Sequence, residues 1–234
     1  MAVSVDTVYQ RVLAILNKEQ RGYVTPQEFN LFANQAQMDI FEQYFYDINQ
    51  FGRLHGNDTE YSDMLNILNE KINIFETKAN LSYDVGTGFW QIPSDLYRLG
   101  TIIFDNSGSS VEAERINANE YLYINASPLT KPTNARPIFI ARANGYKVYG
   151  NTQLTTGVSC NYIKKPAKVE WAYQEIAGRA LYDAGAQTDF ELHISEETEL
   201  VYKILQLAGL SIKELQVYQL GNQMEVQNTQ QEKA

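Results

Sequence analysis

The stretch NKEQRGYVTPQEF, residues 17–29, decides how the chain begins, because it has features both of a calcium-binding loop and of a corner between two helices. As an EF-hand loop it would place Gly22 at the sharp turn and Arg21 at a ligand position. The other side-chain ligand positions would fall on Asn17, Glu19, Thr25 and Glu28. An arginine is always cationic and offers no acceptor atom, so Arg21 argues strongly against calcium.

A helical corner accounts for the same residues without a metal. Thr25 is a good N-cap, Pro26 suits the first helical position, and Glu28 can reach back to the cap in a capping box. Val24 and Phe29 flank the cap at the positions of a hydrophobic staple. The stretch therefore predicts that one helix ends at Gly22 and the next begins after Thr25.

Apolar residues recur at helical spacing on both sides of this corner and again further on. Residues 5–20 form one expected helix, the stretch after the corner as far as Phe51 a long second one, and residues 60–77 a third. The apolar positions that define them are Val5, Val8, Val12, Ile15, Leu16; Phe29, Ala33, Ala36, Ile40, Tyr44, Ile48, Phe51; and Met64, Leu65, Leu68, Ile72, Phe75. Residues 1–78 are thus predicted to be an antiparallel helical unit.

From residue 80 the pattern changes to short runs rich in β-branched and aromatic residues, separated by turn residues. Asn144-Gly145 is a strong hairpin signal between two of these runs. Residues 79–188 are accordingly predicted to form an inserted antiparallel β domain. Within it, residues 169–184 fit either a hairpin or a helix, and the alternating Trp171, Tyr173 and Tyr182 favour the hairpin.

The C-terminal part returns to a helical pattern. Ser195 is the expected N-cap of a helix within residues 189–210 that carries Glu196, Glu197 and Glu199 in its first turn, and Gly209 is its expected end. Residues 211–234 are predicted to form a short helix and a flexible, glutamine-rich tail that can order on a partner. The fold class expected from the whole chain is α+β.

Composition excludes several classes of protein. The chain has 234 residues and a single cysteine, Cys160, so it has no internal disulfide. Its formal net charge of −9 argues against the basic surface that is typical of DNA binding. No apolar run reaches the roughly 20 residues of a membrane span, and no secretion signal is recognised at the N-terminus. The 16 tyrosines suit wet protein interfaces.

A search for reactive groups gives no catalytic, cofactor-binding or metal-binding prediction. The two histidines, His55 and His193, have no second ligand at a suitable spacing, and Cys160 lies in an alternating strand as a small hydrophobe. The acidic pairs Glu112 with Glu114 and Glu196 with Glu197 are explained by an exposed face or a helix start. The GTG at residues 86–88 is interpreted as a turn. We expect a protein that is not an enzyme.

Four strings spread along the chain resemble the head-to-tail connector proteins of short-tailed bacteriophages, especially the ring proteins of crAss-like phages. They are GYVTPQEFNLFANQAQ (22–37), YINASPLTKPTNARPIFI (123–140), YIKKPAKVEW (162–171) and FELHISEETELVYKILQLAG (190–209). The similarity lies in their order along nearly the whole chain. One position departs from it, since Ile194 stands where a proline is expected.

The resemblance implies a structural virion protein of the phage neck or tail, assembled in the host cytoplasm, with no membrane partner. It would form a homo-oligomeric ring, expected to be a dodecamer, that joins the portal protein to adjacent tail ring proteins and lines the channel through which DNA passes without specific binding. A ring needs two different complementary faces on each subunit. The alternatives are a cytoplasmic protein-binding module and a carbohydrate-active enzyme that uses an acidic pair.

Overall fold

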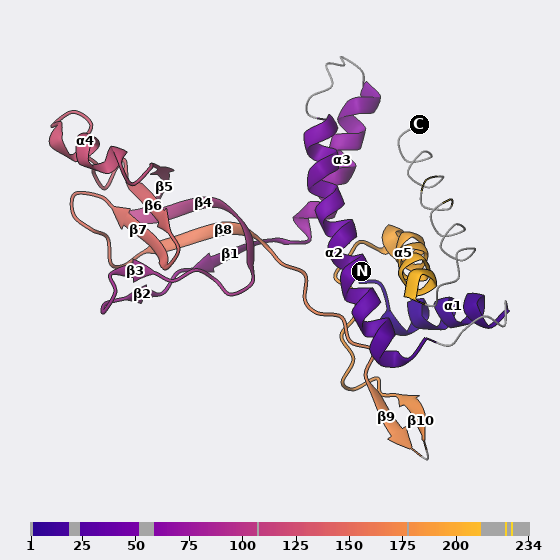
Figure 1. Ribbon diagram of the computed structural model, residues 1–234. Helices are drawn as coiled ribbons and strands as arrows, with labels where there is room; N and C mark the ends of the chain where they lie inside the picture. Colours follow the sequence, from indigo (N-terminus) through magenta and orange to yellow (C-terminus); the bar gives the residue numbers. More distant parts are fainter. Residues whose placement is uncertain are drawn as a thin grey trace. The chain divides into compact units, whose positions relative to one another are not determined.

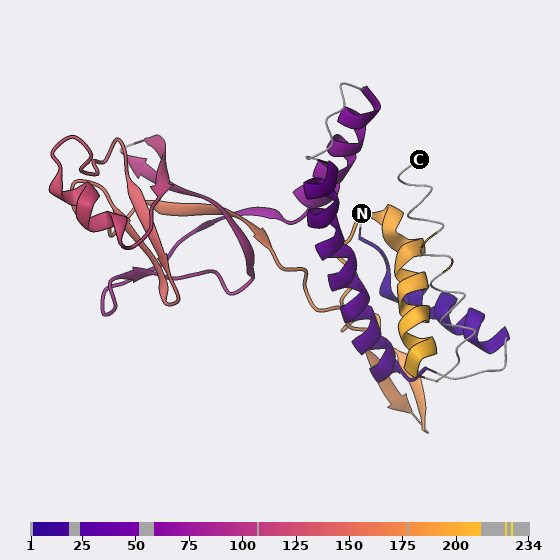
Figure 2. The ribbon, with the colours of Figure 1, turned by 45° about the horizontal axis from the view of Figure 1, so that its top comes forward.

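The computed structural model describes residues 2–18, 24–51, 59–106, 108–176 and 178–211, together with Gln223 and Val226. The chain forms two compact units, each described by itself (Figures 1 and 2). The helical unit combines Met1–Ile74 with Pro166–Ala234, and the β unit is Phe75–Lys165. The presence of both helices and a large sheet confirms the α+β class.

The helical unit contains α1 (Val5–Lys18), α2 (Pro26–Phe51), α3 (Thr59–Asn73), β9 (Tyr173–Ile176), β10 (Arg179–Tyr182), the 3-10 turn η1 (Ile194–Glu196) and α5 (Glu197–Ser211). The β unit contains β1 (Glu76–Asn80), β2 (Tyr83–Asp84), β3 (Phe89–Trp90), β4 (Leu96–Asn106), β5 (Ser109–Arg115), α4 (Glu120–Ala126), β6 (Ile138–Arg142), β7 (Gly145–Tyr149) and β8 (Val158–Lys164).

The capping box at the start of α2 is confirmed. The Thr25 backbone N–H and hydroxyl both donate to Oε2 of Glu28, at 3.0 and 2.8 Å, and the Glu28 N–H donates to the Thr25 hydroxyl at 3.3 Å. Val24 and Phe29, the expected staple, are both buried. Gly22, the expected end of the preceding helix, lies outside the described residues.

The helices pack as their apolar spacing predicts, with small exceptions. The expected core residues of α1 and α2 that are buried are Val5, Val8, Val12, Leu16, Phe29, Ala33, Ala36, Ile40 and Tyr44. Ile15 is exposed and Ile48 is half-buried, so the core side of each helix is narrower than expected. Helix α3 ends at Asn73, and Phe75 is buried just beyond it.

Residues 169–184 form the favoured hairpin, with β9 antiparallel to β10. Its anchor is Trp171, whose ring stacks on Tyr173 and Tyr182 with centroids 5.9 and 5.5 Å away. The same indole lies 4.5 Å from the ring of Tyr9 on α1 and donates its N–H to Asp6 at 2.9 Å. The hairpin therefore belongs to the helical unit.

This placement changes the expected division of the chain at residues 78 and 188. The β unit begins at Phe75 and ends at Lys165, and residues 166–188 pack with the helices. A strand pattern identifies strands, but it does not say against which partner they pack. The contacts that decide the boundary join positions more than 100 residues apart, such as Asn34 and Val169.

The β unit is built on an eight-stranded sheet with the order β1-β8-β4-β5-β6-β7-β3-β2. The expected antiparallel arrangement needs a correction, because β5 pairs with β6 in parallel. The chain crosses between these two strands through α4, which the sequence analysis missed. Strands β1 and β5 were also missed, because their sequences (ETKAN, SSVEAER) are mostly polar, with no buried position in β1 and one in β5.

The hairpin between β6 and β7 is confirmed, but its turn is displaced by one residue. Arg142 pairs with Gly145, which leaves Ala143 and Asn144 as the two loop residues. Gly145 instead begins β7 with a φ of 139°, and a Cβ there would lie 2.2 Å from the carbonyl oxygen of Trp90. The glycine is thus required by the close approach of β3.

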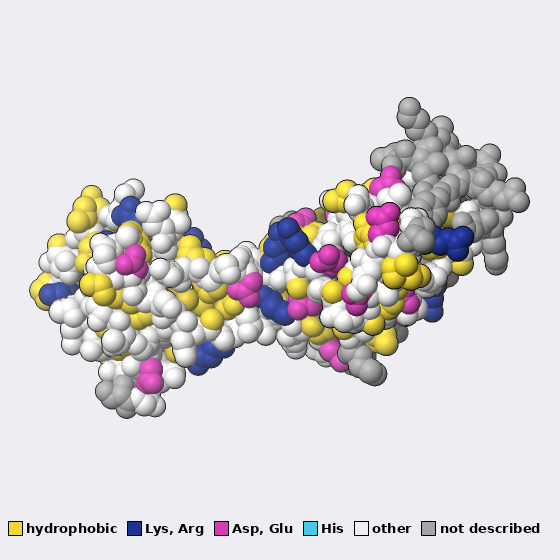
Figure 3. Space-filling view, turned by 90° about the horizontal axis from the view of Figure 1, so that it is seen from below, with side chains coloured by type: hydrophobic (Ala, Val, Ile, Leu, Met, Phe, Trp, Pro, Cys, Tyr) yellow, Lys and Arg dark blue, Asp and Glu magenta, His cyan; other side chains and the backbone are white. Residues whose placement is uncertain are grey.

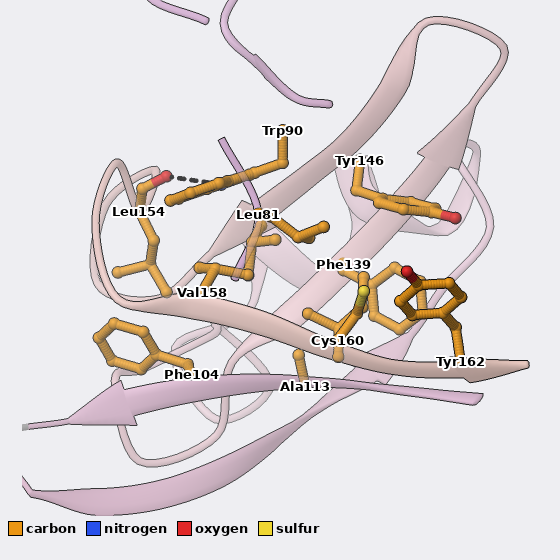
Figure 4. Packing of buried hydrophobic residues seen from close by; sticks show 12 residues of the cluster. Leu81, Trp90, Phe104, Ala113, Phe139, Tyr146, Leu154, Val158, Cys160 and Tyr162 are labelled. Atoms are coloured by element: carbon orange, nitrogen blue, oxygen red, sulfur yellow. Dashed lines mark hydrogen bonds between the residues drawn. The ribbon is translucent and has the colours of Figure 1, made fainter. Parts of the chain in front are cut away.

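One hydrophobic core contains side chains from β8 and β4 and also from β7 and β3, which lie towards the two ends of the strand order. The sheet therefore curves around this core (Figure 4). It includes Trp90, whose indole N–H donates to the carbonyl of Leu154 at 3.1 Å, and the fully buried Cys160. A second, smaller cluster lies under α4, where Tyr121 stacks on Tyr149 at 4.5 Å. Helix α4 is thereby held on the β unit by one side only.

The start and the end of the C-terminal helix also differ from the expectation. Helix α5 begins at Glu197 and follows η1, so Ser195 lies inside η1 and is not an N-cap. The N-cap of η1 is His193, whose Nδ1 accepts the N–H of Ser195 at 3.3 Å. Helix α5 continues through Gly209 to Ser211, since Ala208 and Gly209 are buried and held by packing. The predicted short helix and tail at 211–234 lie outside the described residues, except Ser211, Gln223 and Val226.

Candidate functional site

The strongest chemical grouping in the described residues is the turn His193–Glu196. The Ser195 hydroxyl lies 2.9 Å from Nδ1 of His193 and 3.0 Å from Oε1 of Glu196, so a serine, a histidine and a carboxylate meet. In an acyl-transfer triad the histidine stands between the nucleophile and the acid. Here the serine stands between the other two. The turn has the residue types of a triad but not its geometry.

Each member of this turn also has a structural partner. Nδ1 of His193 caps η1, and Glu196 is only 1% exposed. The Nζ of Lys71 lies 2.6 Å from Oε1 of Glu196, so the carboxylate forms a buried ion pair between α3 and η1. A buried carboxylate requires such a partner. The local sequence indicates only a helix start at Glu196 and gives no signal for this pair, because Lys71 is distant in the sequence.

The remaining candidates from the sequence have different surroundings within their own units. Glu112 and Glu114 are exposed on β5, on the same side of the strand. Glu197 forms an ion pair with Arg11 at 2.8 Å. Cys160 is enclosed in the core of the β unit, where burial raises the pKa of its thiol and leaves it unreactive. His55 lies outside the described residues.

In the described ranges, no three His, Cys, Asp or Glu side chains are grouped so that they could hold a metal ion. Glu28, a ligand position of the calcium-loop hypothesis, is engaged in the capping box, and the hydrogen bonds from Thr25 lower the pKa of its carboxyl. Nor does any helix in these ranges combine the length and hydrophobicity of a membrane span.

Two open depressions lie on the β unit, on either side of Gly100. One, of about 440 Å³, is lined by residues of β1, β4 and β8, and the other, of about 380 Å³, by residues of β4, β5 and β6. They arise where the register of β4 shifts between Leu99 and Thr101. A Cβ on Gly100 would lie 2.9 Å from the carbonyl oxygen of Asn161, so β4 and β8 approach closely here.

A row of side-chain amides on α2 makes a regular series of hydrogen bonds to the backbone within the helical unit. Asn30 donates to the carbonyl of Trp171 at 3.3 Å and accepts its N–H at 2.8 Å. Asn34 exchanges the same two bonds with Val169, at 2.8 and 3.0 Å. We call this row, with Gln37, the amide seam.

Gln37 completes the seam by joining two segments. Its Nε2 donates to the carbonyl of Ala167 at 2.8 Å, and its Oε1 accepts the N–H of Glu191 at 3.1 Å. In return, the carboxylate of Glu191 accepts the N–H of Ala167 at 2.9 Å. Gln37 is 1% exposed, so this is a buried polar contact.

The seam follows from the spacing of its residues. Four residues of a helix rise about 6 Å, and two residues of an extended chain span about 6.6 Å. Amides at positions i, i+4 and i+7 of α2 can therefore match every second residue of the segment 167–171. The apolar pattern that predicted α2 does not include these amides. Their helical spacing was the signal that could have identified them.

Charge is unequally divided between the two units. The β unit has nine Lys and Arg against seven Asp and Glu, whereas the helical unit has ten against twenty-one. On the face shown in Figure 3 most of the visible acidic side chains lie on the helical unit. The net charge of −9 is thus carried by the helices, and the β unit is slightly basic.

Large apolar side chains are exposed at several separate places. Those that are more than half exposed are Leu31 and Tyr46 on α2; Val85 in the β2–β3 turn; Leu122, Tyr123 and Leu129 on and after α4; and Ile176 and Leu181 on the hairpin. Leu122, Tyr123 and Leu129 are 72%, 79% and 96% exposed. Clustered exposed apolar residues of this kind mark surfaces that contact other macromolecules.

Comparison with known proteins adds no identification, since no protein-family model and no curated protein matches the sequence.

Proposed function

We propose that this chain is a structural subunit of a phage neck, assembled as a ring between the portal and the tail. The proposal rests on the ordered resemblance of four strings to connector proteins. Three of these strings meet at the amide seam: residues 22–37 supply its amides, residues 162–171 its extended segment, and residues 190–209 supply Glu191. The resemblance therefore covers the framework of the helical unit.

The distribution of polar and apolar groups supports a structural role. Among the described residues, three that have the chemistry of a catalyst, His193, Glu196 and Cys160, are used in a cap, an ion pair and the core. The exposed apolar side chains instead occur at several separated places, which suits a subunit that contacts more than one neighbour. The acidic helical unit would let DNA pass without adhering, because adhesion needs clustered cations.

The test is the composition of purified phage particles. Quantitative mass spectrometry should find the chain as a stoichiometric component, in a copy number that matches the rotational symmetry of one ring. Electron cryomicroscopy of the neck should then place the fold between the portal and the tail. Absence from particles that contain portal and tail proteins, together with a monomeric protein at high concentration, would contradict the proposal.

A further inference from the structure

Helix α4 and the loop after it form a basic and apolar surface on the β unit, which we call the α4 patch: Leu122, Tyr123, Leu129, Lys131 and Arg136. Tyr121 and Ile124 face inwards on the small cluster, so Leu122 and Tyr123 face out. The loop is folded back, because the Thr130 hydroxyl donates to the carbonyl of Ile124 at 3.0 Å. The patch is thus a formed surface.

Helix α2 carries a surface of the opposite charge. Its core side packs inside the helical unit and its amide side forms the seam, which leaves a third side, the α2 stripe: Leu31, Gln35, Asp39, Glu42 and Tyr46. These residues lie within about 80° on a helix of 100° per residue. Leu31 and Tyr46 are 71% and 66% exposed. All 26 residues of α2 lack Lys, Arg and His.

The α4 patch and the α2 stripe are complementary in both properties. Each combines exposed apolar side chains with charges mainly of one sign. On and after α4 the cations Lys131 and Arg136 outnumber the single acid Glu120, whereas the charged residues of α2 are all acidic. Complementary charges select partners and fix their register, while the apolar groups supply affinity. The two surfaces are also different, as a heterologous contact in a ring requires.

We infer that the α4 patch of one subunit binds the α2 stripe of the next copy of this chain. The inference rests on the proposed ring and adds to it which surfaces form the repeated contact. Tyr123 would lie against Tyr46, with Lys131 opposite Glu42. Two alternatives, a contact within one chain and the binding of a nucleic acid to the patch, are distinguished from this contact by the following experiment.

Two variants that each have one added cysteine besides the buried Cys160, Tyr123→Cys and Tyr46→Cys, are mixed at assembly concentration and oxidised. Each chain has only one accessible cysteine, because Cys160 is buried. A disulfide between the two variants therefore reports a contact between copies. We expect the mixed pair to cross-link efficiently. Tyr123→Cys mixed with Ile67→Cys, an exposed position on α3, is the control and should cross-link weakly.

Charge reversal adds an independent check. Lys131→Glu should reduce cross-linking about tenfold, and Glu42→Lys on the partner variant should restore it. A disulfide only within a Tyr46→Cys/Tyr123→Cys double variant, or only between two Tyr123→Cys chains, would overturn the inference. So would protection of the patch by duplex DNA instead of by a second copy.

The outcomes also separate this inference from the proposed function. Rings seen by native mass spectrometry without the mixed disulfide would leave the ring proposal standing and refute the contact assigned here. A chain that never associates, alone or on portal-containing particles, would refute both.

Discussion

Asn30 and Trp171 exchange two hydrogen bonds, from the amide nitrogen to the carbonyl oxygen and from the backbone N–H to the amide oxygen. The side-chain amide of Asn30 thus makes the two hydrogen bonds that a neighbouring strand would otherwise make to this extended segment. The same arrangement recurs at Asn34, so the segment 167–171 is held by a helix as if by a sheet.

Removal of one amide from the seam should destabilise the helical unit. Asn34→Ala leaves the N–H and C=O of Val169 without partners in a partly buried position, at a cost of about 1–3 kcal/mol. Urea unfolding followed by circular dichroism measures the change. Asn49→Ala is the matched control, because Asn49 is exposed and bonds only to its own helix at Phe45. Equal effects of both substitutions would contradict the role of the seam.

The buried ion pair between Lys71 and Glu196 predicts strong coupling. Lys71→Met leaves the Glu196 carboxylate buried without its ammonium partner, which should lower the free energy of unfolding by about 3–5 kcal/mol. In the double variant Lys71→Met/Glu196→Gln, the loss of free energy of unfolding should be much smaller than the sum of the losses in the two single variants. Arg11→Met breaks an ion pair whose arginine is 54% exposed and should cost about 0–1 kcal/mol. Additive single effects would show that the pair does not form.

Gly145 should tolerate no side chain. Gly145→Ala places a Cβ against the Trp90 carbonyl and forces an unfavourable φ, so we expect a loss of about 2–5 kcal/mol in the stability of the β unit. Gly108→Ala also has a positive φ but meets nothing within 4 Å, and should cost about 1–2 kcal/mol. Labelling with 5-fluorotryptophan gives one resonance per unit, from Trp90 and Trp171, so that unfolding of the β unit can be followed by itself.

The capping box predicts a pH dependence. Hydrogen bonds from the Thr25 N–H and hydroxyl lower the pKa of Glu28 below its ordinary value. The stabilisation is therefore fully present above the unfolded pKa of about 4.3 and is lost as the pH falls through the lower folded pKa. Between about pH 5 and pH 3, Glu28→Gln should lose less stability than the unmodified chain. Glu42→Gln removes the same charge from α2 away from the cap, and should follow the unmodified chain.

Ile194 should accept the proline that the connector resemblance leads one to expect. It is the first residue of η1, it is 48% exposed, and His193 before it is extended with a ψ of 148°. A proline there restricts the unfolded chain and should stabilise the helical unit by about 0.4–1 kcal/mol. Gln206→Pro, in the interior of α5, should cost about 3 kcal/mol. If thermal unfolding showed that Ile194→Pro destabilises the chain as much as Gln206→Pro, the prediction that position 194 accepts a proline would be wrong.

Local signals predicted local structure well. The capping box at Thr25, the hairpin after Trp171 and the burial of Cys160 each depend on neighbouring residues or on an alternating pattern, and the structure contains them. The contacts of Asn34 with Val169 and of Lys71 with Glu196 join distant positions, and no local pattern specifies such pairs. The same reason explains the misplaced boundary at residue 188.

The two ends of the β unit lie side by side. The Lys164 N–H donates to the Phe75 carbonyl at 2.9 Å, and Glu76 pairs with Ile163. A segment whose two ends are hydrogen-bonded neighbours can be lost, duplicated or exchanged in one recombination event without stretching the helices that flank it. Residues 75–165 therefore have the topology of a cassette, and evolution can vary this part of the protein while it keeps the helices unchanged.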